Sequence, residues 1–235
     1  MKYEANTIYH VYNQGNNKQK IFFKPENYQY FKRKIAKHIR PYADILAYCL
    51  MPNHFHLLIR TNESAIQNSN ASCPFSRDNM ERIMLEHAIS QRLDIERNPD
   101  PFPARQSNLS HSIGQMLSSY AKAINHQEQR SGSLFRQRTQ AKDGSKEHAI
   151  TLAGDVHEFF IPLEAYWQTC FDYINDNPVV AGLCHRKEDW PHSSVHEFNS
   201  PSYKDLVNHH LVEQLGLNEN YKSRVKLRLR SVQTA

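Results

Sequence analysis

The chain has 235 residues, of which 39% are hydrophobic and 23% charged, and its net charge of +5 at pH 7 favours a polyanionic partner without identifying one. Its 7 glycines form neither G-x-x-x-x-G-K-[ST] nor G-x-G-x-x-G, which argues against nucleoside-triphosphate and dinucleotide chemistry. No apolar run approaches the roughly 20 residues that span a bilayer, and the N-terminus lacks a signal-peptide core, so we expect a cytoplasmic protein with no membrane partner.

Four patterns define the first part of the chain. They predict, in order, a strand at 7–13, a helix at 25–38, and strands at 43–51 and 54–60. Pro25 fits the first turn of the helix, and Pro41 stops it. The second strand is almost wholly apolar, as expected of a strand covered on both faces, and Pro52-Asn53 predicts a tight turn after it.

The second part of the chain is less regular. Residues 62–108 are expected to form an insertion, in which only residues 80–95 have a helical pattern. The elements expected after it are a helix at 110–129, a strand at 133–142, a loop at 143–162, a helix at 163–177 and a small helix at 203–215. Because proline pushes the preceding residue out of the helical region, Pro178 leaves Asn177 at a helix terminus. Residues 222–230 alternate basic and apolar side chains, which predicts either a phosphate-binding strand or a solvated tail.

This order of elements predicts an α+β fold. Strand, helix, two strands, helix, strand and a further helix are typical of a ferredoxin-like antiparallel sheet with helices on one face and an added C-terminal helix. In that arrangement the first and third strands, at 7–13 and 54–60, form the central pair of the sheet.

Two histidines lie on one face of the third strand. Side chains alternate along a strand, so His54 and His56 point away from Phe55 and stand on the open face of the sheet. Two imidazoles can bind one divalent metal ion if a third ligand arrives from elsewhere. The alternative is a half-exposed strand with two solvated histidines, since the chain has 14 histidines and short matches arise by chance.

The helix at 163–177 offers a third ligand and a nucleophile. Tyr173 and Asn177 are four residues apart and therefore share a helix face. An amide oxygen is a hard ligand suited to Mg²⁺ or Mn²⁺, and a tyrosine beside the metal can attack a phosphodiester. Free tyrosine, with a pKa of about 10, needs help from the metal or from a base. The alternative is a tyrosine that packs beside the apolar stripe.

Several motifs in their order along the chain resemble the single-tyrosine HUH transposases, and most closely the REP-associated tyrosine transposases. These motifs are Gly15-Asn16-Asn17, residues 50–59, residues 131–135 and residues 173–183, supported by 190–194. The resemblance covers about 1–200, apart from most of the insertion, and divides the chain into a transposase domain at 1–200 and a helical and basic extension at 201–235.

The resemblance implies an enzyme that cleaves and rejoins single-stranded DNA, often beside a hairpin, with Mg²⁺ or Mn²⁺ and a covalent 5′-phosphotyrosine intermediate. His54 and His56 match the paired histidine ligands, Asn177 the third ligand, and Tyr173 the nucleophile on what becomes the catalytic helix. Tyr120, with Asn125 beyond it, is the reserve nucleophile or a core residue. The resemblance also implies a homodimer in which the tyrosine helix can serve the partner's site.

Two other functions are consistent with the residues. One is a domesticated module that binds hairpin DNA without turnover, suggested by the basic residues at 222–230. The other is a metallohydrolase that uses a metal-bound water. His10, on the first strand, is expected either near the metal site or as a structural histidine. The cysteines at 49, 73, 170 and 184 form no Cys-x-x-Cys pair and are expected to be reduced, buried thiols rather than a zinc site or disulfides.

Overall fold

The computed structural model describes residues 3–66, 109–143, 150–152, 155–157 and 163–217. The helix predicted at 80–95, the basic segment at 222–230 and Cys73 lie outside these residues. Within the described part, Cys49, Cys170 and Cys184 are free thiols; Cys49 and Cys170 are buried as predicted, whereas Cys184 is partly exposed. No helix of this part is long and apolar enough to cross a membrane.

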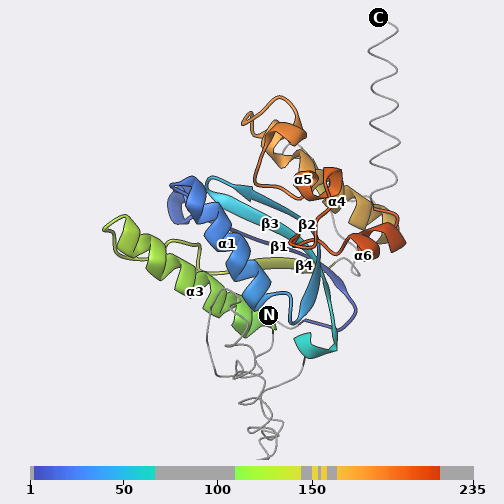
Figure 1. Ribbon diagram of the computed structural model, residues 1–235, viewed down its shortest axis with the longest axis horizontal. Coiled ribbons are helices and arrows are strands. Elements are labelled where there is room, and N and C mark those ends of the chain that lie inside the picture. The colour runs from blue at the N-terminus through green and yellow to red at the C-terminus, as the bar shows by residue number, and fades with distance from the viewer. Residues whose placement is uncertain (1–2, 67–108, 144–149, 153–154, 158–162, 218–235) are drawn as a thin grey trace, which may run out of the picture.

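A four-stranded antiparallel sheet forms the centre of the fold (Figure 1). Its strands are β1 (Ile8–Gln14), β2 (Ala43–Met51), β3 (His54–Thr61) and β4 (Gln140–Asp143), in the spatial order β2-β3-β1-β4. β1 and β3 are therefore the central pair, as predicted. Their register places Tyr12 opposite His56 and Gln14 opposite His54. The α+β class and the antiparallel sheet are confirmed.

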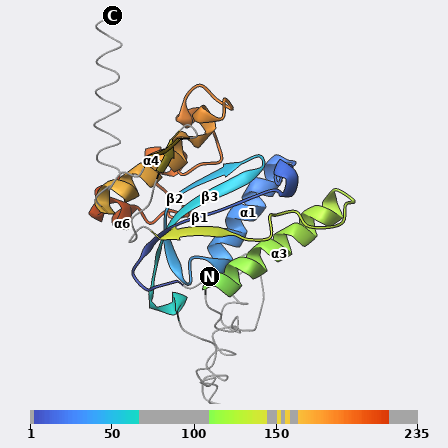
Figure 2. The same ribbon diagram turned by 180° about the vertical axis from the view of Figure 1, so that it is seen from behind.

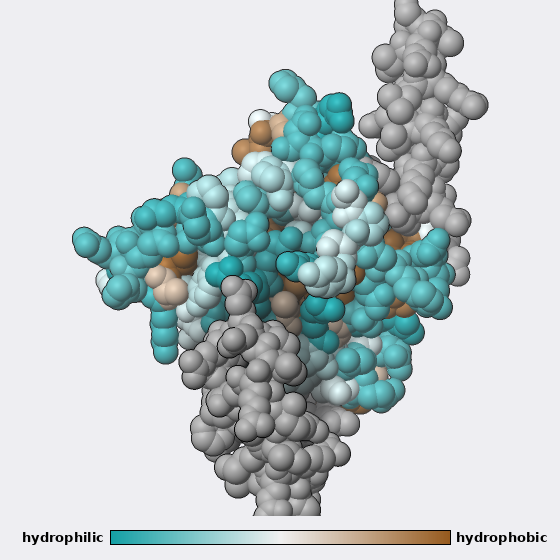
Figure 3. Space-filling model, viewed as in Figure 1, coloured by the Kyte–Doolittle hydropathy of each residue, from teal (hydrophilic) through white to brown (hydrophobic). Residues whose placement is uncertain are grey.

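Helices cover the two faces of the sheet unequally. α1 (Pro25–His38) and α3 (Leu109–Gln127) pack on the face that carries Phe55, whose ring centroid lies 5.1 Å from that of Phe31. α1 crosses in front of the sheet in Figure 1 and lies behind the strands in Figure 2. α4 (Leu163–Val180) contacts β2 and β3 from the opposite face. The predicted layout, with helices on one face and an added C-terminal helix, is thus confirmed. The surface seen in Figure 3 is largely hydrophilic.

α4 is longer than predicted, and Asn177 lies inside it rather than at its end. The helix runs to Val180 with Pro178 within it. Pro178 lies two residues before the end of the helix, and it lacks the N–H that would reach the Ile174 carbonyl. The last turn is closed by a 2.9 Å hydrogen bond from the Ala181 N–H to the Asn177 carbonyl. Proline therefore does not break this helix.

Two predictions for residues 133–162 are wrong. The strand predicted at 133–142 forms only at β4, because the preceding residues pair instead with the loop after β1, where the Asn16 N–H donates to the Leu134 carbonyl at 2.9 Å. The segment predicted as a loop at 143–162 contains an antiparallel hairpin of β5 (Ile150–Leu152) and β6 (Asp155–His157).

The C-terminal part of the described chain consists of short elements. The helix predicted at 203–215 forms only as the shorter α6 (His209–Gln214). A further short helix, α5 (Val195–Asn199), was not predicted. Elsewhere, the described residues also include three short 3₁₀ helices: η1 (Asn16–Lys18), η2 (Glu63–Ala65) and η3 (Lys187–Asp189).

Residues 190–194 lie along the outer edge of β2 and join α4 to it. The Leu50 N–H donates to the His192 carbonyl at 2.9 Å, and the Ser194 N–H donates to the Tyr48 carbonyl at 2.9 Å. The Ser194 hydroxyl donates to the Asn175 side-chain oxygen on α4 at 3.0 Å. The motif at 190–194 therefore holds the tyrosine helix in place.

A buried carboxylate ties four elements together. Glu197 on α5 is 6% exposed and accepts hydrogen bonds from the Tyr48 hydroxyl at 2.6 Å and the Lys32 ammonium at 2.9 Å. Its second oxygen accepts from the backbone N–H groups of Leu206 and Val207 at 2.9 and 3.0 Å. Four donors from α1, β2 and the segment before α6 thus converge on one side chain.

His192 makes the stability of the fold depend on pH. Its ring stacks on Tyr28 at 3.6 Å, and burial, together with the charges of Lys32 and His196, lowers its pKa to about 4. In the unfolded chain, His192 binds a proton near pH 6.5. The contribution of His192 to stability is therefore fully present above pH 6.5 and is lost as the pH falls toward 4. Discounted for partial exposure, we expect a loss on the order of 1 kcal/mol by pH 5.

The His192→Phe variant tests this expectation because it keeps an aromatic ring on Tyr28 but cannot titrate. Thermal unfolding of both proteins at pH 7.5 and pH 5 should show a smaller shift of the midpoint in the variant. Equal shifts in the two proteins would assign the acid sensitivity to other groups.

Candidate functional site

Two histidines of neighbouring strands meet on the face of the sheet that α4 covers. His10 Nε2 and His56 Nδ1 lie 2.8 Å apart, and the two rings stack with centroids 5.0 Å apart. Both are buried, at 7% and 6% exposure. The alternative of a solvated pair is therefore wrong for His56, and His10 does lie at the predicted site.

His54 is oriented by its neighbour in the turn before β3. Its Nδ1 lies 2.6 Å from the Asn53 side-chain oxygen, while the Asn53 amide group donates to the Lys18 carbonyl at 3.2 Å. An amide oxygen only accepts, so the contact with Asn53 favours the His54 tautomer that carries its proton on Nδ1.

α4 brings the other two predicted residues to the histidines. The Tyr173 ring centroid lies 5.5 Å from that of His56 and 6.0 Å from that of His10, both in edge-to-face arrangement. Tyr173 is 49% exposed, so it is not a packing residue of the core. Asn177 is 8% exposed, and its side chain hydrogen-bonds to His54. The structure thus brings His54, His56, Tyr173 and Asn177 together, while their chemical roles stay predictions.

The imidazoles of this cluster are held in the neutral form. Burial and the Lys142 charge lower the pKa of His10 to about 4. Burial, with His10 and His54 beside it, holds the pKa of His56 well below its usual value. Burial also lowers the pKa of His54, against the hydrogen bond to Asn177, which raises it. Neutral imidazole is the form that binds metal ions.

The donor set fits a divalent cation only if the amide takes part. In the part of the chain that the structure describes, no group of three or more His, Cys, Asp or Glu side chains is placed to hold a metal ion. His54 and His56 offer two ring nitrogens, and Asn177 beside them offers an amide oxygen. Mixed nitrogen and oxygen donors of this kind suit Mn²⁺, and the oxygen also suits Mg²⁺. His10 stands behind His56 as the hydrogen-bond partner that metal-binding histidines ordinarily have.

The reserve nucleophile, Tyr120, belongs to the core. It is fully buried between α1 and α3, where its hydroxyl donates to the Ile21 carbonyl at 2.8 Å. Asn125 is engaged with the Gly132 carbonyl at 2.8 Å. Tyr120 therefore lies on the other face of the sheet from the histidines and is excluded as the nucleophile of this site.

No protein-family model and no curated protein matches the chain. Among solved structures, the chain is similar to one described as "Structure of the REP associates tyrosine transposase bound to a REP hairpin". The two share 15% sequence identity over 88% of this chain and 87% of that chain, with a TM-score of 0.46. At these values the similarity does not assign a family.

Two residues of the site carried no clear signal in the sequence. Tyr12 stacks on His56 with ring centroids 5.6 Å apart, and Lys142 on β4 stands opposite His10 in the sheet. The alternation of the first strand places Tyr12 on the same face as His10, but that face meets His56 only through the register of β1 and β3.

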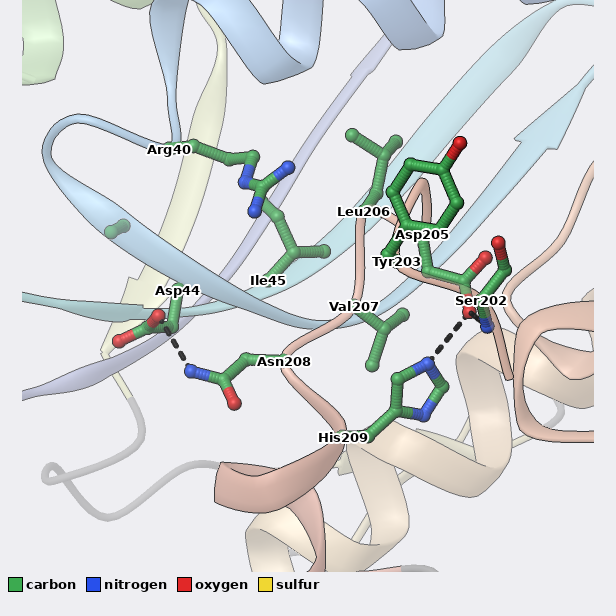
Figure 4. Close-up of a pocket in the computed structure, with 11 residues that line it drawn as sticks. Arg40, Asp44, Ile45, Ser202, Tyr203, Asp205, Leu206, Val207, Asn208 and His209 are labelled. Atoms are coloured by element: carbon green, nitrogen blue, oxygen red, sulfur yellow. Dashed lines mark hydrogen bonds and ion pairs between the residues drawn. The ribbon is translucent and has the colours of Figure 1, made fainter.

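A cavity of about 440 Å³ lies at the far end of β2 (Figure 4). There Asn208 donates to the Asp44 carboxylate at 2.9 Å, and His209 Nε2 lies 2.8 Å from Asp205. Its lining on β2 ends at Ile45, four residues before the partner of His56, which is roughly 13 Å along a strand. Because its carboxylates are already paired, this cavity adds no reactive group to the histidine site.

Proposed function

We propose that this protein is a metal-dependent enzyme that cleaves and rejoins single-stranded DNA, beside a hairpin, through a covalent bond to Tyr173. The observation that carries the proposal is the half-exposed Tyr173 ring held edge-on against His10 and His56, with Asn177 bonded to His54 one turn away. A phenol, two buried imidazoles held neutral and an amide oxygen stand together here, and they can supply a nucleophile and the ligands of a divalent cation.

Each group has a defined part in the reaction. The Tyr173 oxygen attacks the phosphorus, its bond to phosphorus forms as the bond to the 3′-oxygen breaks, and the leaving oxygen takes a proton to become a 3′-hydroxyl. Because Tyr173 is half-exposed, both the strand and the water that accepts the phenolic proton can reach it. His54, His56 and Asn177 would hold the divalent cation, which polarises the phosphate oxygens when bound. Attack by a 3′-hydroxyl on the phosphotyrosine reverses the step and rejoins the strand.

The site is assembled from a single chain. Tyr173 contacts the histidines of its own sheet, and Asn175 holds the same helix to the edge of β2 through Ser194. These contacts support cleavage in cis, so the predicted homodimer is not required to complete the site.

The test is formation of a protein–DNA adduct that survives denaturation. The full chain is incubated with single-stranded hairpin DNA labelled at the 5′ or the 3′ end, with Mg²⁺, with Mn²⁺ or with a chelator. We expect the adduct to need the metal and to carry the 3′ label, because Tyr173 retains the 5′-phosphate of the downstream fragment. The 5′-labelled fragment should leave with a free 3′-hydroxyl.

Across a library of hairpins, two other outcomes would each favour a different function. Tight hairpin binding without any adduct would contradict the proposal and favour a binding module without turnover. Metal-dependent cleavage without an adduct would favour hydrolysis by a metal-bound water.

A further inference from the structure

Two loops at the His54 end of the sheet are strongly basic. Residues 15–24 and 130–139 together contain six lysines and arginines and no aspartate or glutamate. These six residues define what we term the basic surface: Lys18, Lys20, Lys24, Arg130, Arg136 and Arg138. All but the partly buried Arg130 are exposed, and in the described part of the chain none of the six is ion-paired.

The two loops form one unit. The Asn16 N–H donates to the Leu134 carbonyl and the Arg136 N–H to the Gln14 carbonyl, both at 2.9 Å. The Gln19 side chain donates to the Ser133 and Leu134 carbonyls at 3.2 and 3.1 Å. Cations that are far apart in the sequence are therefore carried on a single bonded platform.

This platform is also tightly folded. A Cβ atom at Gly15 would lie 2.1 Å from the Gln19 carbonyl oxygen, so only glycine permits the loop to close on itself. Leu134 and Phe135 are buried beneath the second loop and anchor it to the core. The charges of the basic surface thus project from a defined backbone, which lowers the entropic cost of binding a rigid partner.

The basic surface is continuous with the histidine site through Asn53. The Gly15 N–H donates to the Asn53 carbonyl at 2.8 Å, and the Asn53 side chain bridges the Lys18 carbonyl and His54 Nδ1. A polyanion on the first loop would therefore lie next to the residue that orients His54.

We propose that the basic surface binds the phosphate backbone of the DNA hairpin stem and delivers the adjoining single strand to Tyr173. This inference rests on the proposed function. Six cations spread over two loops match a run of phosphates rather than a single anion, and a stem is the stiff form of DNA that a fixed platform can hold.

The test measures hairpin binding by fluorescence anisotropy in the presence of a chelator, so that no cleavage occurs. The Arg136→Gln/Arg138→Gln variant is compared with wild type and with Arg40→Gln/Lys204→Gln, which loses the same charge at exposed positions beside the cavity of Figure 4. We expect the first pair to weaken binding roughly 10- to 100-fold at about 0.1 M salt and to reduce the slope of log affinity against log salt by about 2. The control pair should change both values little.

Unchanged affinity and slope in Arg136→Gln/Arg138→Gln would overturn this proposal, as would an equal loss in the control pair. Adduct formation at saturating DNA separates this inference from the proposed function. If the variant binds weakly yet forms the adduct at saturating DNA, both stand. If wild type forms no adduct but loses binding on substitution, the basic surface stands and the cleavage proposal fails.

Discussion

Tyr173→Phe is expected to abolish the covalent adduct while leaving hairpin affinity unchanged. The substitution removes only the phenolic oxygen and keeps the ring against His56 and His10, so the histidine cluster should remain in place. Loss of a nucleophile that acts as part of a unit costs about 10⁴-fold or more in rate. Denaturing gels of labelled hairpin DNA give the rate, and anisotropy gives the affinity.

Tyr12→Phe is the matched control, because Tyr12 lies on the same face and its ring also stacks on His56. This variant should form the adduct at close to the wild-type rate. Cleavage by Tyr173→Phe at full rate would exclude Tyr173 as nucleophile. If that cleavage were then lost in His54→Ala or His56→Ala, a metal-bound water would be the attacking group.

Glu197→Ala is expected to lower the free energy of unfolding more than the other substitutions do. The carboxylate is nearly fully buried and accepts from Tyr48, Lys32 and two backbone N–H groups. Removing one partner of a buried ion pair costs about 3–5 kcal/mol, because the remaining charge and donors lose their acceptor. For a chain of this length the melting temperature should fall by about 6–20 °C. Urea and thermal unfolding provide the two measurements.

Two variants make this result specific. Glu197→Gln keeps the shape of the side chain and one accepting oxygen, but it removes the charge and replaces the other acceptor with an NH₂ donor, so its loss should be intermediate. Glu213→Ala removes an exposed carboxylate from α6 and should change stability by no more than about 0.5 kcal/mol. A loss below about 1 kcal/mol in Glu197→Ala would show that the four donors find other partners.

Local periodicity predicted much of this site. Alternation along the third strand put His54 and His56 on one face, and the four-residue spacing put Tyr173 and Asn177 on one side of a helix; the structure shows both pairs together. These predictions succeeded because each needs only the geometry of one element.

What the sequence could not predict depends on contacts between distant segments. The His10–His56 contact requires the register of β1 against β3, which no local pattern specifies. Residues 133–139 have a strand-like composition but bond to the loop after β1 instead. Pro178 lies inside α4 although it cannot donate to the Ile174 carbonyl, and the helix ends two residues later at Val180.

The segments that lie along β2 also determine how copies of this protein can associate. The outer edge of β2 uses its Tyr48 and Leu50 backbone groups on residues 192–194, and its Ile45 carbonyl accepts from the Asn208 N–H at 2.9 Å. An open strand edge is a template on which another chain can add a strand. With these groups occupied, sheet-to-sheet polymerisation through β2 would first have to strip away the segment that anchors α4. The outer edge of β2, beside α4, is thereby protected from edge-to-edge aggregation.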